Sequence, residues 1–256
     1  MNNSNSPNNE QMIVDQSYWD KSYSKLKFFR LQQGDQTTAL LNKYLPRAKA
    51  DKSAFEIGCF PGRFIAEIGE LGYVLHGCDT TPRVATDLGP WLESQGYAVG
   101  EIIQAPYQDF IDNRYDLVAS FGFIEHFDDY ENVFLEHCKM VNAGGYLVVQ
   151  FPNFRGLVQH KLHQYFDLDN LNNHVIAAME LEFYRKILPA DFDTLYCRYY
   201  GGFDFWTDDF KKRNSYLKRK FLKLFMKTKS LWKLLGDDPR WSPHGMIIAK
   251  RKPTNG

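Results

Sequence analysis

Residues 54–65 constrain this 256-residue chain most, because they predict a buried strand, a glycine turn and a helix in immediate succession. Their sequence is Ala-Phe-Glu-Ile-Gly-Cys-Phe-Pro-Gly-Arg-Phe-Ile. Glycines let a backbone approach a ligand closely, and the N–H groups at a helix N-terminus favour negatively charged groups. The stretch is therefore either a loop for a nucleotide-like ligand or an ordinary strand-to-helix turn.

Strand and helix patterns alternate from residue 54 to residue 151. Further strands are predicted at 73–79, 101–105, 115–120 and 146–151, and helices at 62–71 and 128–141. Such alternation with short connections predicts an α/β fold with a doubly wound, mostly parallel sheet and right-handed crossovers. Alternating patterns at 193–200 and 245–250 add a sixth and a seventh strand.

The glycine spacing narrows the choice of ligand. A dinucleotide fingerprint has the form G-x-G-x-x-G, whereas Gly58 and Gly62 are four positions apart with Phe60 between them. Glu56, Gly58 and Gly62 resemble motif I of the class I S-adenosylmethionine-dependent methyltransferases, acid-x-G-x-G-x-G. Phe60 occupies the place of the middle glycine, so we expect the turn to have a different shape.

Two later segments follow in the order that this family shows. Asp79 ends the second strand, 17 positions after Gly62, where a carboxylate can accept hydrogen bonds from ribose hydroxyls. Capping of the following helix is its alternative role, and we expect Thr81 to cap while Asp79 binds. Residues 115–127, YDLVASFGFIEHF, resemble the fourth-strand motif of the same methyltransferases.

The resemblance implies a Rossmann-like, seven-stranded sheet with helical cap insertions, and methyl transfer from S-adenosylmethionine, with S-adenosylhomocysteine as product. In many family members an acid after the third strand meets the adenine, but Pro106 stands at that position, so Tyr107 or Gln108 would substitute. The cofactor-binding residues implied in this way are Glu56, Gly58, Cys59, Phe60, Gly62, Asp79, Thr80, Tyr107, Gln108, Phe121, Gly122 and Glu125.

The resemblance also suggests where a methyl acceptor lies. Tyr18-Trp19-Asp20 and Tyr23 resemble the entry segment ahead of motif I, with a helix packed on the core as the alternative. In this family the segment that follows the fifth strand commonly closes over the acceptor. The predicted acceptor-binding residues are Trp19, Tyr23, Arg155, His160 and His163.

Histidine is the natural candidate for a general base, because its pKa lies near neutrality. His126 is the first candidate and His174 the second, with packing or substrate orientation as the alternative role of each. His160 and His163 have helical spacing, but no third or fourth metal ligand is evident, so no metal site is predicted. The four cysteines are far apart and are expected to be reduced and buried.

The predicted organisation has a core interrupted by insertions. Its parts are a disordered tail at 1–16, a helical arm at 17–46, a cofactor-binding core at 47–152, a helical cap at 153–192, core strands within 193–203 and 241–252, and a basic helical insertion at 204–240. No apolar run is long enough to span a membrane and no signal pattern begins the chain, so we expect a cytoplasmic protein.

The basic insertion contains one predicted helix, Lys211–Leu235, with ten Lys or Arg residues and no acid. The rest of the chain then has 21 basic against 31 acidic residues, although the whole has no net charge. An apolar stripe along this helix either docks on the protein itself or contacts an anionic membrane surface. Nucleic acid is the least favoured partner, because no known nucleic-acid-binding motif accompanies these basic residues.

The predicted function is methyl transfer to a small-molecule acceptor such as a glycan, a quinone-like lipid or a natural-product scaffold. Two other classes stay open at this point. One is a non-catalytic binding module with a nucleotide-binding fold, which the departures at Phe60 and Pro106 allow. The other is a nicotinamide-dependent dehydrogenase, which the glycine spacing disfavours. The sequence does not indicate an oligomeric state.

Overall fold

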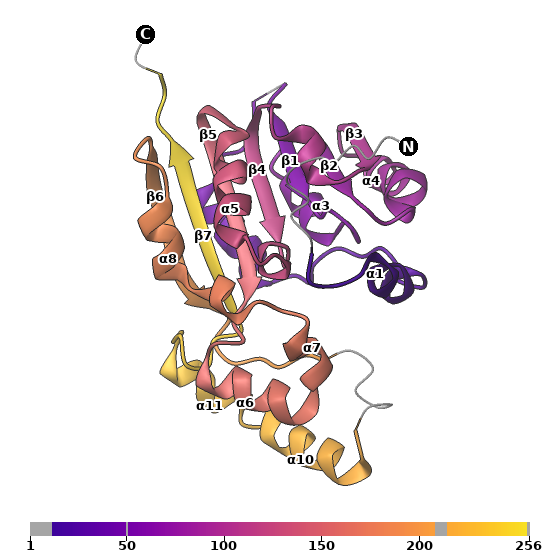
Figure 1. Cartoon of the computed structure of the whole chain (residues 1–256), viewed down its shortest axis with the longest axis vertical. Coiled ribbons are helices and arrows are strands. Elements are labelled where there is room, and N and C mark those ends of the chain that lie inside the picture. Colours follow the sequence, from indigo (N-terminus) through magenta and orange to yellow (C-terminus); the bar gives the residue numbers. More distant parts are fainter. Residues whose placement is uncertain (1–11, 50, 208–213, 255–256) are drawn as a thin grey trace, which may run out of the picture.

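A seven-stranded sheet forms the centre of the computed structural model, which describes residues 12–49, 51–207 and 214–254 (Figure 1). The strand order is β3-β2-β1-β4-β5-β7-β6. All neighbouring strands are parallel except β7, which is antiparallel to both β5 and β6. The strands are β1 (Ser53–Ile57), β2 (Val74–Asp79), β3 (Val99–Gln104), β4 (Tyr115–Phe121), β5 (Val141–Pro152), β6 (Phe192–Tyr200) and β7 (His244–Arg251).

The direction in which successive strands are added reverses between β1 and β4. The strands β2 and β3 lie on the β1 side of this point, and β5, β7 and β6 lie on the β4 side. A doubly wound sheet opens a crevice at the carboxyl ends of the strands at such a reversal. The predicted fold class and the seven strands are therefore confirmed, and the candidate ligand loop after β1 lies at this crevice.

Helices cover both faces of the sheet, because its central strands are apolar on both sides. On one face α5 (Tyr130–Lys139) and α8 (Leu181–Ile187) bury Phe134 and Tyr184 against the sheet. On the other face lie α2 (Gln36–Tyr44), α3 (Arg63–Gly69) and α4 (Gly89–Ser94), which bury Leu41, Ile65 and Leu92.

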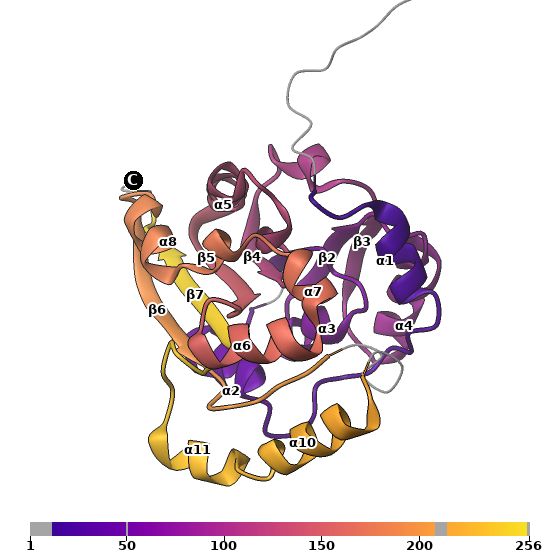
Figure 2. The ribbon, with the colours of Figure 1, turned by 60° about the horizontal axis from the view of Figure 1, so that its bottom comes forward.

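A separate lobe lies beyond the carboxyl ends of the parallel strands (Figures 1 and 2). It consists of α6 (Leu157–Phe166), α7 (Leu168–Asn172), α10 (Tyr216–Met226) and α11 (Lys229–Leu235). A third apolar cluster holds it together, with Leu162 and Phe166 from α6 packed near Leu222 from α10. The two insertions after β5 and β6 thus form one cap.

Several predicted boundaries are wrong. The predicted tail extends too far, because Met12 forms a β-bridge to Phe127, Val14 is buried and α1 (Gln16–Tyr23) begins at residue 16. The predicted basic helix is interrupted: α10 ends at Met226 and α11 begins at Lys229, while residues 211–213 lie outside the described part.

Two further differences concern β5 and α8. The strand β5 begins at Val141 and includes the two glycines that were expected to precede it, with a register shift against β4 in this region. The helix α8 packs against the sheet and does not belong to the cap, although it lies within the predicted cap range 153–192.

In the described part of the chain, no helix is both long enough and apolar enough to cross a bilayer.

Candidate functional site

A cavity of about 1490 Å³ opens at the carboxyl ends of β1, β2 and β4. Its size exceeds the roughly 300–1,000 Å³ of a pocket for one small molecule. The glycine turn, Asp79 and the segment after β4 line it, together with Trp19 from α1 and His174 from the segment after α7. The cavity therefore has room for a cofactor and an acceptor together.

The glycine turn needs glycine at both of its predicted anchors. Gly58 has a φ of +70° and Gly62 has a φ of +90°, a region that other residues rarely adopt. A Cβ atom at Gly62 would lie 2.4 Å from Cδ1 of Leu88, and one at Gly58 would lie 2.7 Å from Cδ2 of Phe123. The turn leads directly into α3, whose N-cap is Gly62.

Asp79 shapes this turn and also faces the cavity. Its Oδ2 accepts from the backbone N–H of Phe60 at 3.3 Å, and its Oδ1 accepts from that of Thr81 at 2.8 Å. Burial raises the pKa of Asp79 to about 6. We expected Thr81 to be the capping residue, but Asp79 itself accepts the hydrogen bond from the Thr81 N–H. Each oxygen of the Asp79 carboxylate keeps a further lone pair that can accept from a ligand.

Phe60 packs the glycine turn against the N-terminal arm. Its ring centroid lies 5.0 Å from that of Tyr23 and 5.6 Å from that of Phe28, and the Arg83 guanidinium lies 5.3 Å from it. The Phe60 side chain is almost fully buried in this cluster. The aromatic residue in place of the middle glycine thus fastens the arm over the turn.

The turn after β3 contains Tyr107 and Gln108, and both line the cavity. The Tyr107 hydroxyl donates to Oε2 of Glu136 at 2.7 Å, which directs this side chain into the core. Thr80 also lines the cavity, and its hydroxyl donates to Gln16 at the start of α1. These contacts tie the edge of the cavity to α1 and to α5.

A histidine buried behind β4 supports the turn that follows this strand. His137 donates from Nδ1 to the Val133 carbonyl at 2.7 Å, so its Nε2 accepts from the Ser120 hydroxyl at 3.1 Å. Burial lowers the pKa of His137 to about 4, which keeps the ring neutral. Phe121 then stacks on Phe64 of α3 with ring centroids 4.2 Å apart, so the end of β4 is fixed on both faces.

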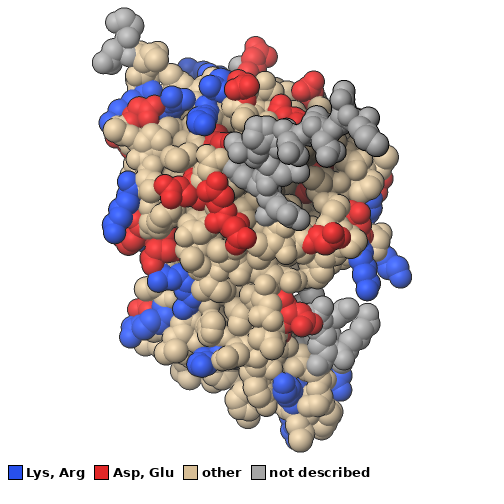
Figure 3. All heavy atoms as spheres, in the orientation of Figure 1, with Lys and Arg blue, Asp and Glu red and all other residues tan. Residues whose placement is uncertain are grey.

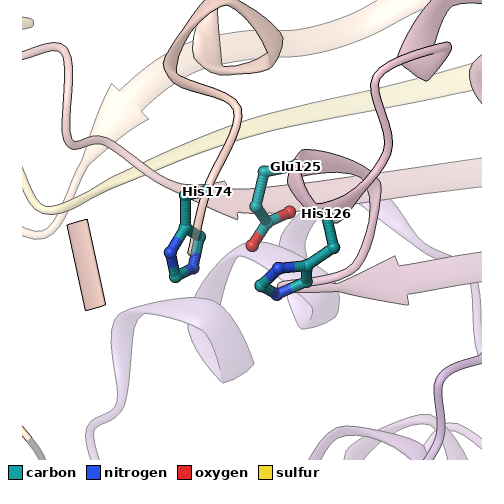
Figure 4. Close-up of side chains that lie close together, drawn as sticks. All are labelled: Glu125, His126 and His174. Carbon is teal, nitrogen blue, oxygen red and sulfur yellow. The ribbon is translucent and has the colours of Figure 1, made fainter. Parts of the chain in front are cut away.

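Glu125, His126 and His174 converge on one point of the cavity (Figure 4). One ligand atom of each residue lies within 4.8 Å of the corresponding atoms of the other two. Glu125 and His126 belong to the turn after β4, and His174 comes from the cap. The Val175 N–H donates to the Glu125 carbonyl at 2.8 Å, so a backbone hydrogen bond holds the two segments together.

Burial dominates the electrostatics of these three groups. It raises the pKa of Glu125 to about 8, and it lowers the pKa of His126 to about 3 and that of His174 to about 4. Both imidazoles are therefore neutral at pH 7. Neither oxygen of Glu125 has a hydrogen-bond partner among the described residues.

The predicted acceptor residues divide into two groups. Trp19 and Tyr23 line the cavity, and the Trp19 ring lies edge-on to His126 with centroids 4.9 Å apart. Arg155, His160 and His163 do not line it. These positions do not support their predicted role as acceptor contacts. The packing of each residue explains why it lies away from the cavity.

Each of these three residues has other contacts in the cap. Arg155 forms an ion pair with Glu180, and Nδ1 of His160 lies 3.2 Å from the Phe154 carbonyl. His163 is fully buried, with its ring centroid 4.0 Å from that of Phe154. The segment after β5 does reach the cavity, but through Phe154, Asn170 and His174, while no residue of α6 lines it.

The sequence interpretation missed residues that reach the cavity from β5, β7 and the basic insertion. Gln150, Trp206 and His244 line it. Trp206 stacks on His244 with ring centroids 4.8 Å apart, and Nε2 of Gln150 lies 2.9 Å from Nδ1 of His244. The strand β7 follows the last insertion, so no local motif connected these residues with the glycine turn.

Comparison with known proteins decides the family. A family model described as a methyltransferase domain matches residues 29–190. The chain belongs to this methyltransferase family. The match decides against the two other classes, a non-catalytic module and a nicotinamide-dependent dehydrogenase. A search of curated protein sequences found no match.

Solved structures show the same methyltransferase fold. A methyltransferase from Thiobacillus denitrificans in complex with S-adenosylhomocysteine has a TM-score of 0.56 and 14% identity, over 93% of this chain and 99% of the other. The N-methyltransferase NodS from Bradyrhizobium japonicum, also with S-adenosylhomocysteine, has a TM-score of 0.52 and 13% identity, over 84% and 86%. Magnesium protoporphyrin IX methyltransferase from Synechocystis has a TM-score of 0.53 and 10% identity, over 93% and 95%.

The protein is thus a methyltransferase, and it shares its fold with S-adenosylmethionine-dependent enzymes of known structure.

Proposed function

We propose that this enzyme methylates a small molecule held between the end of β4 and the cap. The observation that carries the proposal is the single cavity that joins the glycine turn to Trp19, His126 and His174. A donor on the glycine turn and an acceptor under the cap would share this space. Methyl transfer gains mainly from such alignment of the two reactants.

The residues on the donor side fit the cofactor. Gly58 and Gly62 both have a left-handed backbone conformation, and both line the cavity. Asp79 is a partly buried carboxylate at the end of β2, suited to accept from ribose hydroxyls. In this proposal Gly58, Gly62 and Asp79 hold the methionine part and the ribose, and Tyr107 and Gln108 border the adenine.

S-adenosylmethionine supplies a methyl group already activated by the sulfonium charge. The protein then has to orient the acceptor and exclude water. His126 and His174 are the candidates for taking a proton from a hydroxyl acceptor, because hydrogen bonds hold each ring through Nδ1 and leave Nε2 available. Their lowered pKa values mean that each would hold such a proton only weakly at neutral pH.

Aromatic side chains favour a small acceptor with an apolar or sugar-like face. Trp19, Tyr23 and Trp206 line the cavity beside His126 and His174. The similar enzyme from Synechocystis acts on magnesium protoporphyrin IX, a small molecule. A glycan, a quinone-like lipid and a natural-product scaffold all remain within this class.

Calorimetry tests the donor side directly. We expect S-adenosylhomocysteine to bind the purified protein and NADH not to bind. Asp79→Ala should weaken binding about 100-fold, since a charged acceptor is lost. Asp116→Ala is a matched control: its carboxylate also accepts a backbone N–H, that of Ser53, but at the opposite end of the sheet. Failure of S-adenosylhomocysteine to bind would overturn the proposal.

We also propose that the cap contacts an anionic membrane surface. The lobe shows a largely uncharged surface with scattered Lys and Arg, while acidic groups gather mainly over the sheet (Figure 3). Of the predicted apolar stripe, Phe225 and Trp232 pack on the cap. The apolar residues left exposed on α10 and α11 are Tyr216, Leu217, Phe221, Leu224, Leu231, Leu234 and Leu235.

This arrangement combines apolar side chains with basic ones, as an interfacial helix does. Both predicted interpretations of the stripe are therefore supported, docking for one part and surface contact for the other. Contact with a membrane would favour the lipid-like acceptor among the three candidates.

Co-sedimentation with vesicles tests the membrane contact. We expect binding to vesicles of phosphatidylserine and phosphatidylcholine but not of phosphatidylcholine alone. The double change Leu217→Ser and Leu224→Ser should reduce binding at least about tenfold, since two exposed leucines no longer enter the interface. Leu195→Ser, at an exposed leucine of β6, is the control. Absence of binding to anionic vesicles would remove both the contact and the lipid-like acceptor.

A further inference from the structure

Glu125, His126 and His174 offer one carboxylate and two imidazoles to a common point (Figure 4). The Glu125 carboxylate points toward the space between the two rings, whose centroids lie 4.6 Å apart. This donor set, two nitrogen atoms and one oxygen, is one that binds divalent transition metals in proteins. The residues come from two segments separated by α5, β5 and two helices of the cap.

The hydrogen bonds of both histidines prepare the rings as ligands. Nδ1 of His126 lies 3.0 Å from the Asn173 carbonyl, and Nδ1 of His174 lies 2.6 Å from the Asn170 carbonyl. A carbonyl only accepts, so each Nδ1 carries the proton and each neutral ring has a free lone pair at Nε2. In many proteins a backbone carbonyl that accepts from the other ring nitrogen orients a metal-binding histidine in this way.

Glu125 lacks the partners that a buried carboxylate normally has. The side chain is completely buried, and neither oxygen has a hydrogen-bond partner in the described part of the chain. No Lys or Arg among the described residues forms an ion pair with it. A buried carboxylate without a partner is costly, and a bound cation would offset that cost.

We infer that Glu125, His126 and His174 form a binding site for a divalent transition-metal cation, with its remaining coordination positions open to the cavity. An ion about 2.1 Å from each ligand atom needs these atoms no more than about 4.2 Å apart. A small side-chain rotation closes the observed set to this size. The site could not be predicted from the sequence, because a turn and a distant cap segment supply its ligands.

The open coordination positions of the cation indicate which class of acceptor the enzyme takes. This step rests on the proposed function. A cation at this point would bind an oxygen atom of the acceptor and hold it between the cap and the cofactor side. A hydroxyl bound to a divalent cation loses its proton to water more readily than a free one. The acceptor therefore carries a hydroxyl or a pair of neighbouring oxygen atoms. With a cation bound, His126 and His174 act as its ligands, and the proton goes to water and not to either ring.

Metal titration of the chelator-treated protein tests the site without any methyl acceptor. We expect Mn²⁺ or Zn²⁺ to bind with one ion per chain in calorimetry, and Mg²⁺, which prefers oxygen ligands, to bind more weakly. Glu125→Gln, His126→Asn and His174→Ala should each weaken the transition-metal affinity about 100-fold or more. His76→Gln is the control, since His76 lies on β2 outside the cavity.

A second readout separates loss of the site from loss of the fold. S-adenosylhomocysteine affinity should stay within about threefold of wild type in His126→Asn and His174→Ala, and a metal-dependent rise in Tm should occur only in wild type and in His76→Gln. Wild-type protein that binds none of these cations, or variants that bind them as well as wild type, would overturn the inference. Loss of S-adenosylhomocysteine binding in wild-type protein would instead overturn the proposed function.

Discussion

The two sides of the cavity are built in different ways. On the proposed cofactor side, Gly58, Gly62 and Asp79 come from one continuous segment of β1, the glycine turn, α3 and β2, and the turn after β3 adds Tyr107 and Gln108. The acceptor side combines α1, the turn after β4, the cap and the start of β7. Local backbone geometry determines the first side, and packing between distant segments determines the second.

This difference explains why the two sides tolerate change differently. A turn that depends on positive φ values fails when one glycine is replaced. A surface assembled from several segments depends on many contacts, so one replacement alters it only in part. Variants on the two sides should therefore separate cofactor affinity from the properties of the acceptor side.

Replacement of Gly62 should have the largest effect. Gly62→Ala adds a Cβ atom 2.4 Å from Leu88 at a φ of +90°, which should cost about 3 kcal/mol through strain and overpacking. We expect the Tm to fall and S-adenosylhomocysteine affinity to drop about 100-fold. Gly122→Ala is the matched variant, because its φ is +68° and its Cβ atom would lie 3.5 Å from Glu125. Equal losses in both variants would contradict the distinction between the two sides.

Phe60 joins the two sides, and its replacement tests this connection. Phe60→Gly restores the family's third glycine but removes the ring that packs on Tyr23 and Phe28. We expect a loss of about 2–3 kcal/mol in the free energy of unfolding, and faster hydrogen exchange in α1. Phe60→Leu, which keeps an apolar side chain, should lose less. Unchanged exchange in α1 would show that other contacts hold the arm.

The buried His137 predicts a dependence of stability on pH. Its pKa is about 4 in the folded protein against an ordinary value of 6.5, so the folded state binds the proton less well than the unfolded state. Its contribution is complete above pH 6.5 and is lost as the pH falls toward 4. Between pH 7.5 and pH 5 wild type should lose about 2 kcal/mol more than His137→Gln. Denaturant unfolding at both pH values measures this, and parallel losses would contradict the assignment.

Removal of the Tyr107 hydroxyl should have the smallest effect. Tyr107→Phe deletes the donor to Glu136 in the core and keeps the ring and backbone at the cavity. We expect a loss of about 1–2 kcal/mol in stability, with S-adenosylhomocysteine affinity within twofold of wild type. A large loss of affinity would mean that the hydroxyl, and not the backbone, matters to the cofactor.

Much of the fold could be predicted because its signals are local. Apolar runs bounded by glycine and proline indicated the strands, and their alternation with helices indicated a parallel sheet. The boundaries of β5 and of the basic helices were wrong, since pairing with β4 and packing of the cap determine them. The positive charge of the basic insertion was evident from the sequence. Which of its leucines stay exposed could not be predicted, because that depends on how the cap packs.

By itself the sequence determined the glycine turn, the strand that precedes it and the carboxylate at the end of β2. A positive φ requires glycine and a strand end places a side chain at the sheet edge, whatever the rest of the chain does. Only the tertiary structure decided that Phe60 packs under the arm and that Arg155, His160 and His163 lie away from the cavity. It also brought Glu125 and His126 to His174, because the cap folds back over β4 and a backbone hydrogen bond to Val175 fixes it there.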